Sequence, residues 1–196
     1  MAKGSYKEAA GSEEKQKELM IKDIKGLFEI EERIISKPAR QNVLDEISWK
    51  YTETGKGKNL CCKYWSEKAI DRYKKNIENN EEKDKNKGLV HEHVIPRDIF
   101  INTILKMIKD KSNTEIITKE ELDKRLIACV ITKEEDEMLS KKTMPGKDAG
   151  KGFFDIKDIW GRYRGKEIEV VELKLETDEK GLNTVSNFED KTQMKL

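Results

Sequence analysis

The chain has 196 residues, of which 40% are charged and 35% are hydrophobic, so it is long enough for one domain with a lean core. Its 40 basic and 39 acidic residues leave a formal charge of +1, which excludes a basic field over the whole molecule. Any contact with nucleic acid therefore requires a local basic patch. No apolar run approaches the ~18 residues of a membrane span, and the first residues lack the apolar core of a signal peptide, so we expect no membrane partner.

The cysteines are Cys61, Cys62 and Cys129, an odd number without a CxxC pair. Because disulfides form mainly in oxidising compartments, this count indicates a reduced protein in the cytoplasm. A zinc site built from these thiols and one histidine stays open as an alternative.

Region 1–87 is predicted to be helical. Amphipathic spacing and serine caps predict helices over residues 12–35, 41–49 and 66–77. Pro38 is expected to separate the first helix from the second, because proline interrupts a helix interior. The polar segments are predicted as a loose terminus, a loop and a solvated charge run, at 1–11, 52–59 and 78–87.

The segment 88–97, Gly-Leu-Val-His-Glu-His-Val-Ile-Pro-Arg, holds both histidines of the chain, His91 and His93, on either side of Glu92. It is predicted to form a short strand that Pro96 ends, because proline cannot donate to a β-ladder. Histidine titrates near neutrality, and its neutral ring is a common metal ligand. Two histidines and a carboxylate at the end of a strand therefore indicate a site.

The rest of the chain alternates helices with strands. Helices are predicted over 97–111 and from 118, followed by a β-branched strand over 127–131. A capping box from Thr132 to Glu135 then opens a helix that carries Asp136. Beyond residue 140 we expect a loop, a short helix, a strand and a mobile polar tail, at 141–152, 153–163, 168–175 and from about 178.

These elements predict an α+β fold that is mostly helical, with a small sheet made by 89–95 and 127–131 and joined by 168–175. Three regions are expected: an N-terminal helical region, a core with a helical insertion, and a C-terminal helix and strand with a polar tail, at 1–87, 88–140 and 141–196.

A strand ending in His-Glu-His-Val-Ile-Pro, a second apolar strand and a helix with an acidic residue together resemble the HNH, or ββα-metal, nuclease superfamily, over residues 88–140. In that superfamily the acid or a histidine binds a divalent metal, the next histidine is the general base, and the helix completes the metal site. The resemblance implies a metal-dependent endonuclease that hydrolyses DNA or RNA, in a phage-defence or mobile-element setting.

Carried onto this sequence, the resemblance makes Glu92 a metal ligand and His93 the catalytic general base. Asp136 stands where the superfamily has histidine or asparagine, and a carboxylate there favours Mg²⁺ or Mn²⁺ over Zn²⁺. Arg97 would bind a flanking phosphate. Asn113 is the candidate for the middle asparagine.

Strand geometry leaves two arrangements of this site open. Neighbouring residues point to opposite faces, so His91 and His93 share a face that Glu92 does not. Glu92 and His93 reach one ion only if the strand kinks. A regular strand would instead offer His91 and His93 as metal ligands, with Asp136 as a third.

The near-neutral charge and the Asp136 departure favour an alternative function. In it a catalytically altered HNH-like module binds nucleic acid or a protein partner, as an inhibitor or accessory subunit. The sequence predicts no particular oligomeric state. Five basic residues would supply a phosphate-contacting face: Lys63, Lys68, Arg72, Lys74 and Lys75.

Overall fold

The computed structural model of the protein describes residues 12–31, 34–54, 59–79, 85–139, 141–179, 183–185, 187–189, 191–194 and 196. The predicted terminus 1–11 and parts of the predicted loop 52–59 and charge run 78–87 lie outside these residues. The described helices are α2 (Glu13–Glu29), α3 (Lys37–Thr52), α4 (Glu67–Glu78), α5 (Arg97–Lys109), α6 (Lys119–Arg125), α7 (Lys133–Met138) and α8 (Gly161–Arg164), with 3₁₀ turns at Gly146–Asp148 and Phe153–Asp155. The described strands are β1 (Tyr64–Ser66), β2 (Leu89–His93), β3 (Ala128–Thr132), β4 (Val170–Leu173), β5 (Leu175–Thr177), β6 (Asn183–Val185) and β7 (Lys191–Gln193). This content confirms the predicted α+β class.

One mixed sheet forms the centre of the fold, with its strands in the order β2-β3-β1-β4-β7. Strand β1 pairs parallel with β3, and the other pairs are antiparallel. The predicted pairing of β2 with β3 is confirmed, and its register places His91 opposite Val130 and Glu92 opposite Cys129. Since side chains alternate along a strand, the sheet has a histidine face, with His91 and His93, and a Glu92 face.

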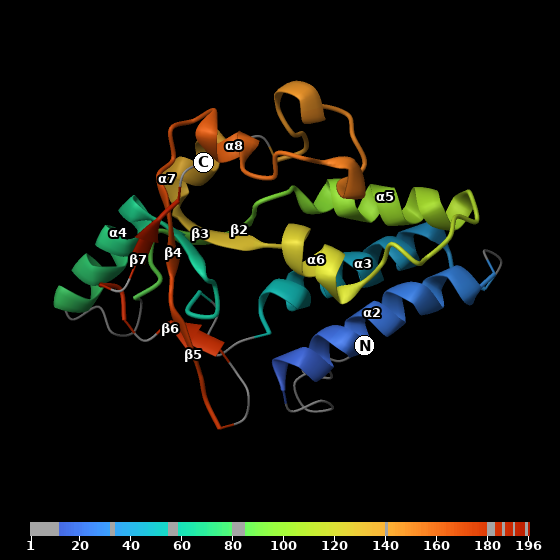
Figure 1. Ribbon diagram of the computed structural model, residues 1–196, viewed down its shortest axis with the longest axis horizontal. Coiled ribbons are helices and arrows are strands. Elements are labelled where there is room, and N and C mark those ends of the chain that lie inside the picture. The colour runs from blue at the N-terminus through green and yellow to red at the C-terminus, as the bar shows by residue number, and fades with distance from the viewer. Residues whose placement is uncertain are drawn as a thin grey trace.

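A helical layer lies at one end of the sheet and consists of α2, α3, α5 and α6 (Figure 1). Its core is apolar, with Met20, Leu44 and Ile104 almost without exposed surface. The amphipathic spacing noted in the sequence explains this, because each helix turns one apolar stripe towards its neighbours. The layer brings the C-terminal turn of α3 to the histidine face.

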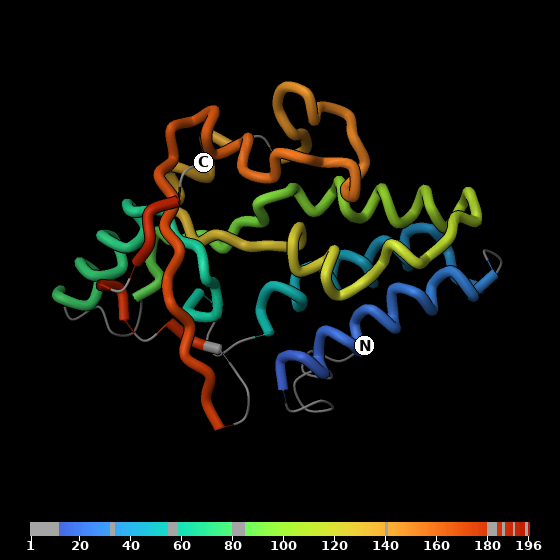
Figure 2. The backbone as a smooth tube through the Cα atoms, viewed as in Figure 1, coloured from blue at the N-terminus to red at the C-terminus, as the bar shows by residue number. Residues whose placement is uncertain are grey.

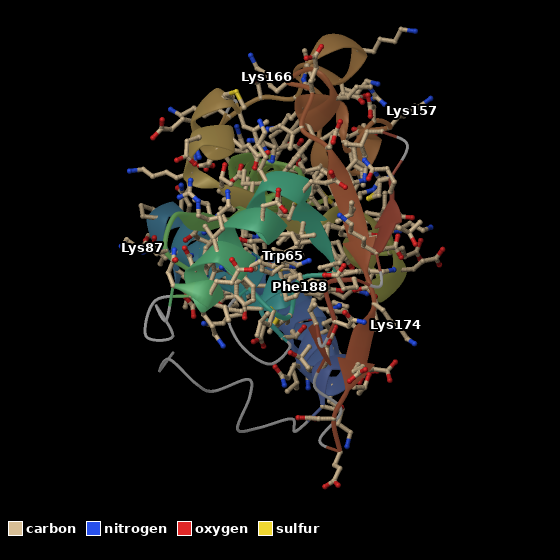
Figure 3. The ribbon with its side chains drawn as sticks, turned by 90° about the vertical axis from the view of Figure 1, so that its left-hand side faces the viewer. Trp65, Lys87, Lys157, Lys166, Lys174 and Phe188 are labelled. Atoms are coloured by element: carbon tan, nitrogen blue, oxygen red, sulfur yellow. The ribbon has the colours of Figure 1, made fainter. Side chains whose placement is uncertain are left out.

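The other end of the histidine face is covered by α4 and by the segment around Phe188. Trp65 of β1 is fully buried there, with its ring centroid 5.6 Å from that of Tyr73 and 5.1 Å from that of Phe188. Figure 3 shows Trp65 and Phe188 together beneath α4. On the Glu92 face, Tyr163 of α8 and Leu139 pack against Cys129 and Ile131.

Several predicted boundaries are wrong. Pro38 lies in the first turn of α3, where its missing N–H costs nothing, and α2 ends well before it. The predicted helix over 153–163 is a 3₁₀ turn followed by the short α8. The predicted polar tail contains β6 and β7, and β7 pairs with β4 at the sheet edge. The chain path returns to α7 and α8 at its C-terminus (Figure 2).

No described helix has the length and apolarity needed to cross a bilayer.

Candidate functional site

The two histidines lie under the last turn of α3. His91 and His93 are 4% and 3% exposed, and Trp49 of α3 covers both rings, with centroid distances of 5.1 Å and 5.6 Å. The histidine rings are 5.8 Å apart between centroids, as strand neighbours on one face should be. The sequence prediction that His91 and His93 share a face is confirmed.

Hydrogen bonds surround the Nε2 atoms of both rings. His93 Nε2 lies 3.1 Å from the carbonyl oxygen of Ser48, which can only accept, so His93 Nε2 carries a proton. The Thr52 hydroxyl lies 3.0 Å from the carbonyl oxygen of Trp49, 2.9 Å from His91 Nε2 and 3.3 Å from His93 Nε2. This hydroxyl therefore connects both rings to the end of α3.

The remaining nitrogen of His91 faces a thiol. Cys62 Sγ lies 3.3 Å from His91 Nδ1. This contact is a hydrogen bond whose direction follows the tautomer of His91. The neighbouring Cys61 thiol and burial raise the pKa of Cys62, which keeps this thiol protonated. The cluster is a continuous chain of hydrogen bonds within the protein.

Burial also decides the charge of His93. Removal from water, followed by repulsion from His91, lowers the pKa of His93 from 6.5 to about 3. A general base works best with a pKa near the operating pH and within reach of the water that it deprotonates. His93 is neutral at physiological pH, but its exposed surface is almost nil and its Nε2 already donates to Ser48.

Glu92 points to the opposite face, where it meets a buried arginine. The Nη2 atom of Arg162 donates to Glu92 over 2.7 Å, and its Nη1 donates to the carbonyl oxygens of His93 and Val94. The side chain of Arg162 is 1% exposed. These hydrogen bonds connect α8 to the end of β2. They also occupy the Glu92 carboxylate, which the resemblance assigned to a metal.

Asp136 lies on the Glu92 side of the sheet. Its charge contributes to raising the pKa of Tyr163, whose ring is buried there, and it forms an ion pair with Lys141. The sheet thus separates His91 and His93 from Glu92 and Asp136. Strand β2 stays regular, so Glu92 does not join His93, and Asp136 does not join the pair of histidines that the regular strand brings together.

The residues present do not fit a divalent ion. Within the described ranges, no group of three or more His, Cys, Asp or Glu side chains is placed to hold a metal. The zinc alternative meets the same obstacle, because the thiols are on different faces of the sheet. Cys62 lies beside His91 on the histidine face, whereas Cys129 pairs with Glu92 in the register and lies on the Glu92 face. The described cysteines are all free thiols.

The predicted phosphate-binding residues are mostly paired within the protein. Arg97 donates to Asp45 over 2.8 Å and lies 5.0 Å from the centroid of a Trp49 ring, so its charge is already matched. Asn113 accepts the amide N–H of Glu115 in the turn after α5. Three members of the predicted basic face are in ion pairs with carboxylates: Lys63, Arg72 and Lys74.

A different basic surface was missed from the sequence. A groove of about 460 Å³ lies between α3 and α5 and is lined by Lys37, Arg40, Leu105, Lys106, Ile108 and Lys109, among others. We call it the basic groove. Each helix contributes two cations three residues apart, and this spacing places them on one helix face. The three-residue spacing of these cations is visible in the sequence, but it does not show that the cationic faces of α3 and α5 lie beside each other.

Comparison with family models, with curated proteins and with solved structures finds no match to this chain. Function is therefore inferred from the geometry of these residues.

Proposed function

We propose that this chain is a nucleic-acid-binding module, in which the strands that resemble an HNH core act as a scaffold and not as a metal-dependent nuclease. The observation that supports this is the burial of both histidines, at 4% and 3% exposure, with each Nε2 hydrogen-bonded inside the protein. A metal ligand or a general base must be reached by the ion or the water, and His91 is already hydrogen-bonded to Thr52 and to Cys62 through its two ring nitrogens.

Charge supports nucleic acid as the partner ahead of a protein. The described lining of the basic groove holds four cations and no carboxylate, on a chain whose net charge is only +1. Phosphate backbones are bound through such local clusters of lysine and arginine. The free thiols of the three cysteines fit the cytoplasmic location expected from the sequence.

The test combines binding and cleavage on one set of proteins. Labelled single-stranded DNA, duplex DNA and single-stranded RNA are followed by fluorescence anisotropy, at low and at physiological salt. Supercoiled plasmid is incubated with Mg²⁺, Mn²⁺ or EDTA. We expect binding that persists in EDTA and weakens with salt, and no cleavage under any of these conditions.

His93→Gln is the matched variant, because its amide keeps a donor where His93 Nε2 donates to Ser48. We expect it to bind as the wild type does. Metal-dependent cutting that disappears in His93→Gln would instead establish the endonuclease. A folded protein that binds none of the three nucleic acids at low salt would refute this partner and favour a protein partner.

A further inference from the structure

The basic groove contains a buried cation whose charge the described chain leaves unmatched. Arg40 lies on α3 and is only 3% exposed. Its Nη2 donates to the carbonyl oxygen of Ile30, while its Nε has no hydrogen-bond partner. Across the described residues, no ion pair joins Arg40 to a carboxylate. Burying a guanidinium in this state is unfavourable unless an anion completes it.

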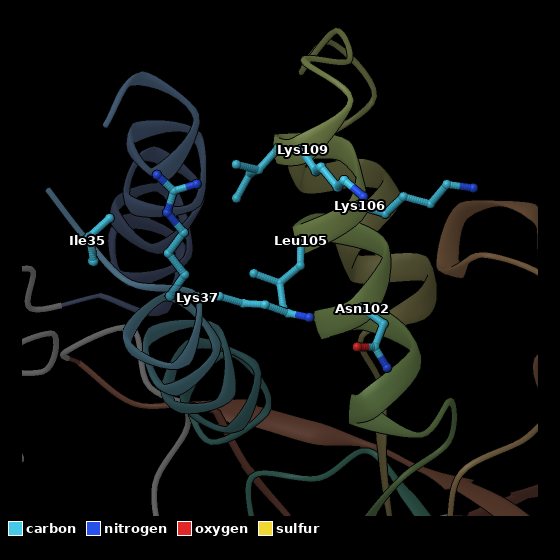
Figure 4. Close-up of a pocket in the computed structure, with 8 residues that line it drawn as sticks. Ile35, Lys37, Asn102, Leu105, Lys106 and Lys109 are labelled. Atoms are coloured by element: carbon cyan, nitrogen blue, oxygen red, sulfur yellow. The ribbon is translucent and has the colours of Figure 1, made fainter. Parts of the chain in front are cut away.

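Three lysines line the groove together with this arginine. Lys37, the first residue of α3, extends towards Leu105 on α5, and Lys106 and Lys109 contribute to the lining from α5 (Figure 4). None of the three lysines has a carboxylate partner within the part of the chain that the structure describes. Many other lysines do, as Lys63 pairs with Glu172 and Lys119 pairs with Asp123. The groove therefore concentrates positive charge that no described carboxylate neutralises.

The walls of the groove are not purely polar. Leu105, Ile108 and Ile35 line it together with the cations, and Asn102 adds an amide that can donate and accept. The volume of about 460 Å³ lies within the range of small-molecule sites, which are apolar clefts with a few polar groups that fix orientation. A ligand for this groove has an anionic end and a flat or apolar end.

We propose that the basic groove binds one nucleotide unit through its phosphate. Arg40 and Lys37 contact the phosphate oxygens, and Leu105 and Ile108 contact the sugar or the base. Arginine suits this task because its planar fork donates to two oxygens at once. If the phosphate belongs to a nucleic-acid strand, this proposal rests on the function proposed above. If it belongs to a free nucleotide, the proposal is independent of that function.

The experiment uses the full chain and separates these two sources. Adenosine monophosphate, adenosine and inorganic phosphate are each titrated into isotope-labelled protein, and backbone amide shifts are followed by NMR. We expect adenosine monophosphate to shift the amides of 35–40 and 102–109, and adenosine to leave them in place. Arg40→Met should weaken this binding by about tenfold or more, since it removes charged hydrogen bonds.

A labelled single-stranded oligonucleotide then tests the strand. On a strand, Lys106 and Lys109 would each neutralise one phosphate that flanks the bound unit. In Lys106→Gln/Lys109→Gln, the slope of log affinity against log salt should therefore fall by about 1.4. The matched control is Lys142→Gln/Lys147→Gln in the segment after α7, which removes the same charge from exposed lysines outside the groove lining. We expect the control to retain the wild-type slope.

The outcomes distinguish the two proposals. If the oligonucleotide binds and both double variants behave alike, the groove is not the site, while the proposed function stands. If adenosine monophosphate binds in the groove and the oligonucleotide does not bind anywhere, the groove is a nucleotide site and the proposed function falls. If no probe shifts the groove amides and no strand binds, both proposals are overturned.

Discussion

Arg162 and Arg40 are both almost fully buried, at 4% and 3% exposure, but their surroundings differ. Arg162 lies under the Glu92 face, where one carboxylate and two carbonyl oxygens accept from it. Arg40 lies at the basic groove, where one carbonyl oxygen accepts from it and no described carboxylate pairs with it. The charge of Arg162 is therefore neutralised within the protein, whereas the charge of Arg40 is available to a ligand.

The same contrast separates the histidine cluster from the basic groove. The cluster has the residue types of a catalytic site, but its rings are buried and hydrogen-bonded within the chain. The groove has ordinary lysines and one arginine, yet no described carboxylate pairs with them. A buried charge carries a large penalty when it has no counter-ion, so such a charge indicates ligand binding better than residue type does.

The largest effect is expected from Arg162→Leu. This change leaves Glu92 without its cation and two carbonyl oxygens without a donor, so the free energy of unfolding should fall by about 3–5 kcal/mol. Urea denaturation monitored by tryptophan fluorescence measures it. The double variant Glu92→Leu/Arg162→Leu should recover part of the loss, because it removes the isolated charge. A double variant as unstable as Arg162→Leu would show that the pairing with Glu92 is unimportant.

A smaller effect is expected from pH. Since the pKa of His93 is about 3 in the folded protein and near 6.5 in the unfolded chain, the unfolded chain binds more protons between these values. The stabilisation is complete above about pH 6.5 and is lost as the pH falls towards 3. From pH 7 to pH 5 the His93 contribution to the free energy of unfolding should fall by about 2 kcal/mol.

His93→Gln isolates this contribution, because glutamine does not titrate. Denaturation midpoints at pH 7, 6 and 5 should fall more steeply for the wild type than for His93→Gln. Parallel pH profiles would mean that His93 is protonated equally easily in both states, and that its ring is more accessible than the hydrogen bonds indicate.

The smallest effect on stability is expected from Arg40→Met. The variant removes a buried charge without a carboxylate partner, and methionine fills a similar volume, so the free energy of unfolding should change by less than about 1 kcal/mol, in either direction. The same denaturation experiment checks it beside Arg162→Leu. A loss as large as that of Arg162→Leu would show that Arg40 is structural and would remove the contrast between the two arginines.

Local signals in the sequence predicted much of the fold. Ser12, Ser66, Thr118 and Thr132 all accept backbone N–H groups at helix starts, and the capping box from Thr132 to Glu135 forms as predicted. These signals are readable because a cap and its partner lie three residues apart. The alternation of side chains along β2 was also readable, because it too is a pattern within a few neighbouring residues.

Features that depend on distant segments were not predicted. Strand β1 has only three residues and takes its place from β3 and β4, so its own sequence carries little strand signal. The pairing of Glu92 with Arg162 joins residues of two predicted regions. The basic groove needs α3 and α5 to lie side by side, which amphipathic spacing alone does not determine. The assignment of His93 as a general base remains a prediction.

The position of β1 also affects how the chain folds. This short strand is central in the sheet, between β3 and β4, although both partners are synthesised much later. Its pairing closes long loops, and contacts of high sequence separation slow folding. Trp65 and its apolar neighbours cannot pack against Val171 and Leu173 until β4 has been synthesised. We expect a nascent chain that stops before Val170 to be a substrate for chaperones.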